Sequence, residues 1–211
     1  MSVQDTLKKV EELYTHNLAE HGTSSKAVGW NTEDCQTLRF DKLAYMVDGS
    51  APYSVNDFGC GYGAQLQYLQ GLGHEVSAYY GYDLSADMLA KASDVLRNTA
   101  TDIHLFQHGN VDTKADYAFV SGTFNVRFES NNEAWETFIQ DTLANLFAHS
   151  NKGVAFNMLT KYADWEEPHL YYGDPCFWFD YCKKHFTKHV AILHDYPLWE
   201  WTLVMRKDEA A

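Results

Sequence analysis

Positively charged residues and long hydrophobic runs are both scarce in this chain of 211 residues. It has 16 Lys and Arg residues against 29 Asp and Glu residues, and its formal net charge is −13. A charge of that sign repels phosphate backbones and anionic lipid surfaces, so we expect neither a nucleic-acid nor a membrane partner. No run of 18 apolar residues occurs, and the chain starts with the amphipathic segment MSVQDTLKKVEEL rather than a secretory signal. We therefore expect a cytoplasmic protein.

Cysteine is sparse as well. The four cysteines, at positions 35, 60, 176 and 182, show no CxxC spacing, so we do not expect a disulfide framework. The segment CKKHFTKH brings Cys182, His185 and His189 together, but a structural metal site needs a fourth ligand in a closed loop. We expect no bound metal, and we interpret Cys176 and Cys182 as buried residues of one helix.

The N-terminal quarter of the chain has a helical pattern. Apolar residues recur at steps of three and four over residues 3–20, and Gly22 supplies a stop signal. Asn31 or Thr32 can cap a second helix. We expect residues 1–50 to form a helical lid and residues 51–211 an α/β domain, which together make one compact unit.

From residue 54 onwards, short apolar runs alternate with helical segments at 64–72, 86–98, 131–150 and 175–186. This alternation predicts a doubly wound α/β fold, in which helices cover both faces of a mostly parallel sheet. The last two runs, at 189–194 and 198–206, are joined by a short turn, so they must pair antiparallel. The sequence thus predicts seven strands, of which only the last runs against the others.

A glycine-rich turn follows the first predicted strand. The strand SVNDF leads directly into GCGYG, which places Gly59, Gly61 and Gly63 before a helix. Glycines there let a ligand lie against the backbone, and the start of the helix offers unpaired amides. Asp83 ends the second strand, where it can accept hydrogen bonds from a ribose diol. Together these features predict a nucleoside ligand.

Two classes of nucleoside site share this arrangement. Gly59, Gly61 and Ala64 satisfy the dinucleotide pattern GxGxxG/A, so an NAD(P)-dependent Rossmann oxidoreductase is one alternative, and a non-catalytic nucleotide-binding module is another. Asp57 favours a different ligand, because its carboxylate would repel a diphosphate and attract a cationic amino or sulfonium group.

The string DFGCGYG followed by GYDLS resembles motif I and the acidic loop of class I S-adenosylmethionine-dependent methyltransferases. The terminal hairpin is similar to the reversed seventh strand of that family, whose fold is Rossmann-like. The resemblance extends over about residues 50–206 and implies S-adenosylmethionine as the cofactor and S-adenosylhomocysteine as its product. It implies that Asp57 and the turn from Gly59 to Gly63, which includes Cys60 and Tyr62, hold the methionine moiety.

The resemblance also assigns the rest of the cofactor. Asp83 would bind the ribose hydroxyls, and Leu84 would pack on the adenine. The third strand is followed by Gly109, Asn110 and Val111 where the family usually has Gly-Asp and an apolar residue, and Asn110 can still pair with the amino group of adenine. Further expected cofactor contacts come from the second helical segment, the end of the fourth strand and the N-terminal loop: Met88, Ser121, Gly122, Thr123, Trp30 and Arg39.

Acceptor-binding groups should follow the fourth, fifth and sixth strands, because ligands of doubly wound sheets lie outside the carboxyl ends of the strands. The loop from Tyr162 to Trp178 is unusually rich in aromatic residues. Aromatic walls with a few polar groups describe a small-molecule pocket, although half of these aromatic residues could simply pack the loop onto the sheet. Arg39 and Arg127 could form a positive patch for an acceptor carboxylate or phosphate. The substrate-binding candidates are Asn125, Arg127, Asn157, Tyr171, Tyr172, Trp178 and Tyr196.

Transfer to an oxygen or nitrogen nucleophile requires a general base. His194 is the first candidate because the sixth strand should deliver it to the rim of the site, and His169 is the second. His194 could instead only hydrogen-bond within the hairpin turn. The fourth strand is followed by SGTFN rather than the [DN]PP[YF] string of nucleobase and glutamine methyltransferases. The sequence therefore predicts a methyltransferase for a small-molecule acceptor, and it predicts no particular oligomeric state.

Overall fold

The computed structural model describes residues 2–30 and 32–208. In chain order these residues form α1 (Val3–His21), the 3-10 helix η1 (Ser25–Val28), α2 (Glu33–Ala44), β1 (Tyr53–Phe58), α3 (Ala64–Gly71), β2 (Val76–Tyr82), α4 (Ala86–Val95), β3 (Asp102–Phe106), β4 (Ala115–Val120), α5 (Asn132–Ala148), β5 (Ser150–Thr160), β6 (Tyr172–Gly173), α6 (Pro175–His185), β7 (Val190–Leu193) and β8 (Glu200–Arg206).

The strands form one sheet in the order β3-β2-β1-β4-β5-β8-β7, and β6 pairs with β5 beside this path. The pairs that β8 makes with β5 and β7 are antiparallel, and the other strand pairs are parallel. The predicted doubly wound, mostly parallel sheet with a reversed last strand is thus confirmed. The sequence pattern does not predict β6, because a strand of two residues has no alternation to detect.

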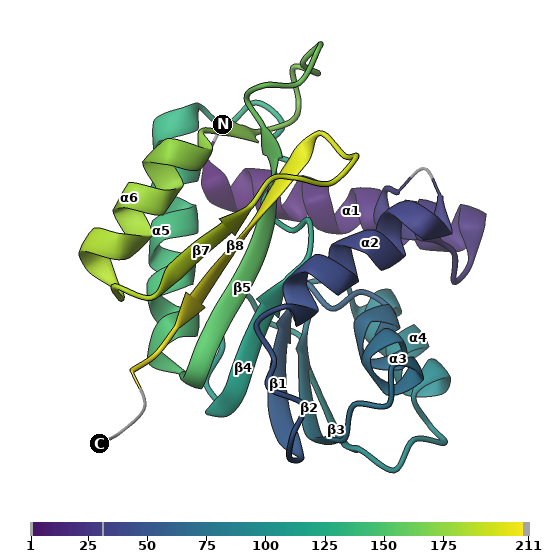
Figure 1. Cartoon of the computed structure of the whole chain (residues 1–211). Helices are drawn as coiled ribbons and strands as arrows, with labels where there is room; N and C mark the ends of the chain where they lie inside the picture. The colour runs from purple at the N-terminus through teal and green to yellow at the C-terminus, as the bar shows by residue number, and fades with distance from the viewer. Residues whose placement is uncertain (1, 31, 209–211) are drawn as a thin grey trace.

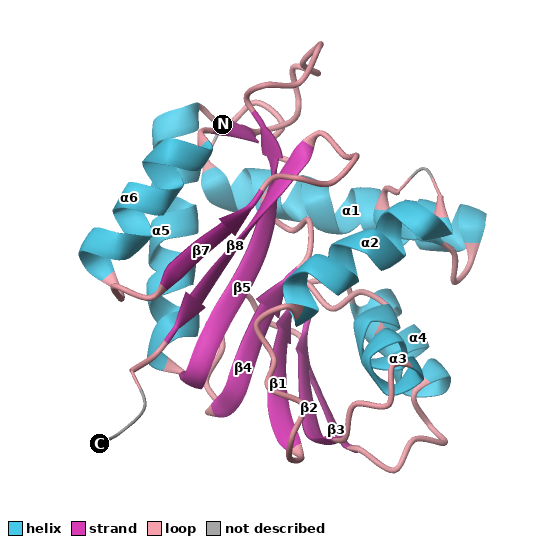
Figure 2. Ribbon diagram, viewed as in Figure 1, coloured by secondary structure: helices cyan, strands magenta, loops and turns pink. Residues whose placement is uncertain are grey.

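Helices cover both faces of the sheet (Figures 1 and 2). On one face, Trp135 of α5 and Trp178 of α6 are fully buried in a cluster with Trp201 of β8. On the other face, Leu43 of α2 and Leu66 of α3 are fully buried in a second cluster beneath α2, α3 and α4. Each face therefore has its own core, which leaves the carboxyl edge of the parallel strands as the place where a ligand can enter.

Helix α1 lies across this carboxyl edge (Figure 1). Ser2 and Asp5 form a capping box at its start, and Gly22 follows its end with a φ of 61°. Two hydroxyl pairs attach the helix to both halves of the sheet. The Thr6 Oγ1 atom is 2.6 Å from Ser130 Oγ before α5, and the Thr15 Oγ1 atom is 2.7 Å from Ser85 Oγ before α4. The predicted N-terminal lid is therefore a helix held at two points.

The second N-terminal helix, α2, begins after Thr32, whose side chain accepts a hydrogen bond from the Cys35 amide at 3.2 Å. Asn31, the other capping candidate, lies outside the described residues. Cys182 is buried in α6 as predicted, but the same prediction for Cys176 is wrong, since Cys176 is exposed. The inner face of α6 carries Trp178 and Cys182, four residues apart, and Cys176 does not share that face.

The residues of the CKKHFTKH segment have separate surroundings. Cys182 is in the core, His185 stacks on Tyr181 with ring centroids 4.4 Å apart, and the Nε2 atom of His189 is 2.6 Å from an Asp208 oxygen. Within residues 2–30 and 32–208, the structure contains no group of three or more His, Cys, Asp or Glu side chains placed to hold a metal ion. None of the helices described is both long and apolar enough to cross a membrane.

The attachment of α1 can be tested by replacing Thr6 with valine, which keeps its shape and removes its hydroxyl. Because Thr6 and Ser130 are both fully buried, Thr6→Val leaves the Ser130 hydroxyl without its partner. We expect the free energy of unfolding in urea to fall by about 1 to 3 kcal/mol. The double variant Thr6→Val/Ser130→Ala should be more stable than the sum of the two single effects predicts. Additive effects would show that the two hydroxyl groups do not interact.

Candidate functional site

The strand order reverses direction at β1, which pairs with β2 on one side and with β4 on the other. The turns that follow β1 and β4 consequently meet at the carboxyl edge. Gly59 has a φ of 79°, and a β-carbon there would overlap the Thr123 side chain, whose Oγ1 donates to the Phe58 carbonyl at 3.0 Å. Glycine is required at this position because the two turns approach so closely.

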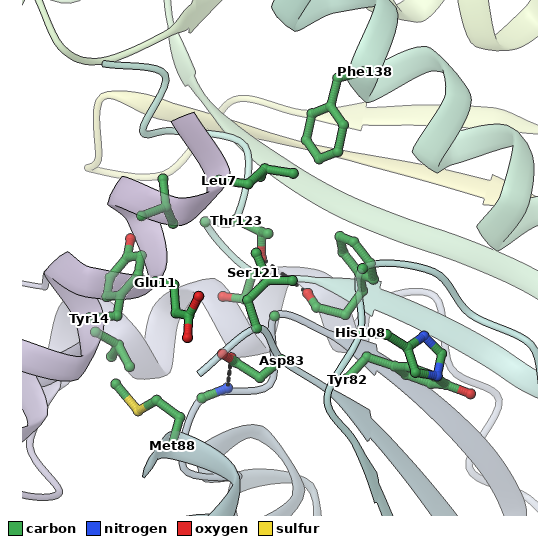
Figure 3. A pocket seen from close by; sticks show the side chains of 18 of the residues that line it. Leu7, Glu11, Tyr14, Tyr82, Asp83, Met88, His108, Ser121, Thr123 and Phe138 are labelled. Atoms are coloured by element: carbon green, nitrogen blue, oxygen red, sulfur yellow. Dashed lines mark hydrogen bonds between the residues drawn. The ribbon is translucent and has the colours of Figure 1, made fainter. Parts of the chain in front are cut away.

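A cavity of about 830 Å³, which includes space open to solvent, lies above these two turns, and we call it the central cavity. Figure 3 shows how side chains from α1 and from the strand ends surround it. Ten of the predicted cofactor residues line it: Trp30, Gly59, Gly61, Asp83, Leu84, Met88, Gly109, Ser121, Gly122 and Thr123.

Asp83 is held by backbone amides at the floor of the central cavity (Figure 3). The Gly61 amide donates to its Oδ2 atom at 2.9 Å, and the Ser85 amide donates to its Oδ1 atom at 2.9 Å. Burial raises the pKa of Asp83, and the hydrogen bonds from Ser85 and Gly61 act in the opposite direction. Since each carboxylate oxygen can accept more than one hydrogen bond, both remain able to accept from a ligand diol.

The roof of the central cavity is α1, whose Leu7, Val10 and Tyr14 line it together with Glu11. Burial, followed by the nearby charge of Asp83, raises the pKa of Tyr14 to about 12, so its hydroxyl stays protonated at neutral pH. Sequence reasoning used the apolar residues only as evidence for a helix and missed their place in the site. The sequence did contain a signal for this role. Helix α1 has an apolar face but comes before every strand, so no neighbouring element in the sequence is an obvious candidate to cover that face. Other lining residues that it missed are Val28, Phe58, Tyr82, His108 and Phe138.

A smaller cavity of about 310 Å³ adjoins the glycine turn, and we call it the side cavity. Asp57 lines it, and its Oδ2 atom accepts a hydrogen bond from the Tyr79 hydroxyl at 2.6 Å. Burial raises the pKa of Asp57 to about 7, against the opposing effect of the Tyr79 hydrogen bond. The Gln65 amide group and the Ser121 hydroxyl also line this cavity, and among the described residues they have no hydrogen-bond partner. These unpaired groups fit a polar ligand.

The charges around both cavities have one sign. Glu11 and Asp83 line the central cavity, Asp57 lines the side cavity, and no Lys or Arg is among the described residues that line either one. Such a site attracts a cationic ligand and repels a diphosphate.

Cys60 and Tyr62 line the side cavity as well. Gly63, Asn110 and Val111 line neither: Gly63 makes room for Leu96, Asn110 is exposed, and Val111 is buried in the core.

Arg39 and Glu200 form a buried ion pair that positions Trp30. The Arg39 Nε and Nη2 atoms each donate to a Glu200 oxygen at 2.7 Å. The Arg39 guanidinium carbon lies 3.6 Å from the centre of the Trp30 ring, and Gly122 approaches the same ring so closely that a β-carbon there would overlap it. Trp30 is thus clamped, and it lines the central cavity, the side cavity and the cavity described next.

The third cavity measures about 1470 Å³ with its open part, and we call it the outer cavity. Helices α1 and α2, the loop over residues 161–171 and the hairpin loop over residues 194–199 surround it. It meets the central cavity at Tyr14, Val28, Trp30 and Gly122, which line both. Three of the predicted acceptor or catalytic residues line it, namely Asn125, His169 and Tyr172.

The positive patch predicted from Arg39 and Arg127 is wrong. The Arg39 charge is paired with Glu200, as described above. Arg127 donates to the carbonyl oxygens of Leu170 at 3.1 Å and Ser130 at 2.7 Å, so its guanidinium group holds the loops together. Arg39 is neutralised by Glu200 and Arg127 lines none of the three cavities, so the two do not form a patch there.

Several residues predicted to contact the acceptor are instead structural. Trp178 and Tyr171 are buried in the core, where the Trp178 Nε1 atom donates to the Tyr171 hydroxyl at 3.2 Å. Asn157 is fully buried and accepts from the Gly122 amide at 2.6 Å, which fixes the turn after β4. The Tyr196 hydroxyl lies 3.0 Å from the Thr202 hydroxyl. Large aromatic rings stabilise a fold most when they are fully buried, which explains the positions of Trp178 and Tyr171.

The first choice of base, His194, is not among the residues that line the three cavities. Its exposed ring stacks on Tyr162, with centroids 6.1 Å apart. The expectation that His194 lies at the rim of the site is therefore wrong. His194 follows the end of β7, in the hairpin loop, and its side chain is exposed there. His169, the second choice, reaches the outer cavity from the other loop.

Comparisons with known proteins agree with this architecture. A family model described as a methyltransferase domain matches residues 55–153. A Mycobacterium tuberculosis protein that is named as a methyltransferase is 42% identical over 164 residues, which cover 77% of this chain and 98% of that protein.

Two solved structures share the fold. Magnesium protoporphyrin IX methyltransferase from Synechocystis PCC 6803, solved with bound S-adenosylhomocysteine, is similar over 98% of this chain and 98% of its own, at a TM-score of 0.66 and 11% identity. An S-adenosylmethionine-dependent methyltransferase from Leishmania major is similar over 95% of this chain and 82% of its own, at a TM-score of 0.67 and 13% identity. From its sequence relative, its family model and its fold, the chain belongs to the class I S-adenosylmethionine-dependent methyltransferases, and S-adenosylmethionine is its cofactor.

Proposed function

We propose that this methyltransferase acts on a small-molecule acceptor that is bound in the outer cavity and presents an oxygen or nitrogen nucleophile. The observation that carries the proposal is the meeting of the central and outer cavities at Trp30 and Gly122. An acceptor in the outer cavity would there face the methyl end of the cofactor. The aromatic walls of the outer cavity support a small molecule. Its only lining Arg or Lys among the described residues is Arg39, already paired with Glu200, so a phosphate backbone finds no free cation there.

The described residues fit the cofactor in two parts. We assign the ribose hydroxyls to Asp83, whose two oxygens are preorganised by backbone amides. We assign the amino and carboxylate groups of the methionine moiety to the side cavity, where Asp57 supplies a carboxylate and Gln65 and Ser121 supply unpaired polar atoms. When bound, S-adenosylmethionine supplies an already activated methyl group.

The work of the protein is then to align the acceptor, exclude water and remove a proton. Trp30 and Tyr14 cover the junction of the two cavities and exclude water from it. We assign the general base to His169, whose backbone carbonyl accepts hydrogen bonds from the amides of Arg127 at 3.0 Å and Phe128 at 2.9 Å. These bonds hold His169 at the wall of the outer cavity, where its imidazole can take the proton of the acceptor.

Two carboxylates around the cofactor site, those of Asp57 and Glu11, argue against the dinucleotide alternative. They would repel a diphosphate, and no Lys or Arg lines the central or side cavity in the described part of the chain to offset the repulsion. The cationic ammonium and sulfonium groups of S-adenosylmethionine are attracted by the same charges.

The role of Asp83 predicts a specific loss of cofactor affinity. Asp83→Ala should weaken binding of S-adenosylhomocysteine by about 2 to 4 kcal/mol, the range for losing charge-assisted hydrogen bonds in a desolvated site. Calorimetric titration measures this change, and Asp87→Ala is the control because Asp87 is exposed in the first turn of α4. Wild-type protein should show no comparable affinity for NADH. An unchanged affinity in folded Asp83→Ala protein would place the ribose elsewhere.

The pKa of Asp57, about 7 in the ligand-free protein, predicts a pH-dependent affinity. The carboxylate attracts the ligand's ammonium group only when ionised, so ligand binding favours loss of the Asp57 proton. Affinity for S-adenosylhomocysteine should therefore rise by about tenfold between pH 6 and pH 8 and level off above the pKa. Asp57→Asn cannot ionise and should show a flat profile at lower affinity. A wild-type profile that is flat over this range would contradict the assignment of Asp57 to the ammonium group.

The two histidines are matched candidates for the base. Transfer of a labelled methyl group to a panel of phenols, alcohols and amines would first identify an acceptor. His169→Ala should then lower kcat by about 100-fold or more, while His194→Ala should leave kcat within about threefold of the wild-type value. Both variants should keep wild-type affinity for S-adenosylhomocysteine. If His194→Ala shows the larger loss, the hairpin loop rather than the 161–171 loop supplies the base.

A further inference from the structure

Large aromatic side chains are exposed at the mouth of the outer cavity. Trp165 is 65% exposed and lines the outer cavity from the 161–171 loop, and Trp199 is 45% exposed and lines it from the hairpin loop. Tyr162, which is 55% exposed, stacks on His194 of the hairpin loop. The amide of Thr160 also donates to the Trp199 carbonyl at 2.9 Å, so the two loops lie side by side. We call the three exposed rings of these two loops the aromatic rim.

The aromatic rim continues an apolar surface that leads inwards. Leu159, Leu170 and Leu198 are half-buried and, like Trp30, line the outer cavity. Contiguous exposed apolar surface is uncommon on a soluble domain, and where it borders a cavity it marks a binding site for apolar groups. Among the described residues, the other exposed large hydrophobic side chains, Tyr45, Leu72 and Phe177, belong to other elements.

The charge next to the aromatic rim is negative. Asp164, Glu166 and Glu167 flank Trp165 in the sequence and are exposed. The cation of the same loop, Lys161, is paired with Asp174 at 2.7 Å. A ligand that lies along the rim therefore meets carboxylates that repel an anion and tolerate a neutral or cationic group.

Resting on the function proposed above, we infer that the acceptor is an amphiphile without negative charge. Its nucleophile faces Trp30 and His169, and its alkyl or aryl portion lies along the three leucines and between Trp165 and Trp199. Burial of the apolar portion against these side chains contributes favourably to the binding free energy. The acidic residues of the loop select against anionic amphiphiles of the same length.

The test uses three probes that share a dodecyl chain, each kept below its critical micelle concentration. Dodecyl maltoside is neutral, dodecyltrimethylammonium is cationic and dodecyl phosphate is anionic. Each is titrated calorimetrically into the full chain that has been saturated with S-adenosylhomocysteine. The neutral and cationic probes should bind, and the anionic probe should bind at least about tenfold more weakly. Maltose, which lacks the chain, should not bind.

A double variant, Trp165→Ala/Trp199→Ala, removes two members of the aromatic rim. It should weaken binding of dodecyl maltoside by about tenfold or more and leave the affinity for S-adenosylhomocysteine unchanged. Tyr45→Ala is the matched control, because Tyr45 is 57% exposed and lies at the end of α2, away from the rim. It should change neither affinity.

Three results would overturn the inference: no probe binds to wild-type protein, the anionic probe binds most tightly, or the double variant binds dodecyl maltoside as the wild type does. Each of these results is obtained on protein that demonstrably holds S-adenosylhomocysteine. A failure of the proposed function looks different, because the panel of phenols, alcohols and amines would then accept no labelled methyl group although the chain binds S-adenosylhomocysteine.

Discussion

The buried ion pair between Arg39 and Glu200 holds the functional part of this structure together. It joins α2, near the start of the chain, to β8, near its end, through two hydrogen bonds of 2.7 Å. The side chain of Glu200 is fully buried and that of Arg39 is 8% exposed, so neither charge can rely on water. Loss of one partner from such a pair typically costs about 3 to 5 kcal/mol, because the other charge is left buried and unpaired.

The position of Trp30 depends on this pair. The Arg39 guanidinium group packs on the indole ring, and the ring in turn rests on Gly122 of the turn after β4. That turn is itself fixed by Asn157, which accepts a hydrogen bond from the Gly122 amide. A residue of the N-terminal segment thereby becomes a common wall of the central, side and outer cavities. On one side of this wall the site is acidic and suits a cationic cofactor, and on the other lies the outer cavity, to which we assign the acceptor.

Local sequence patterns were sufficient for the fold apart from the short strand β6. Apolar runs and helical periodicity predicted the doubly wound sheet and its reversed last strand, and the glycine turn with Asp83 predicted where the central cavity lies. The contacts that shape the acceptor side could not be predicted in this way. Arg39 and Glu200 are separated by 161 positions, so no local pattern shows that they neutralise each other. Whether Trp178 faces the core and Trp165 faces solvent is likewise decided by tertiary packing, since the two residues are equally apolar in the sequence.

A crystal structure of the full chain with bound S-adenosylhomocysteine tests the central claim, that the cofactor and the acceptor meet beside one clamped tryptophan. The account predicts the ribose hydroxyls on Asp83, the amino-acid end of the ligand in the side cavity beside Asp57, and the sulfur next to Trp30 and Gly122, facing the outer cavity. A ligand whose sulfur points away from Trp30, or whose ribose lies away from Asp83, would contradict it.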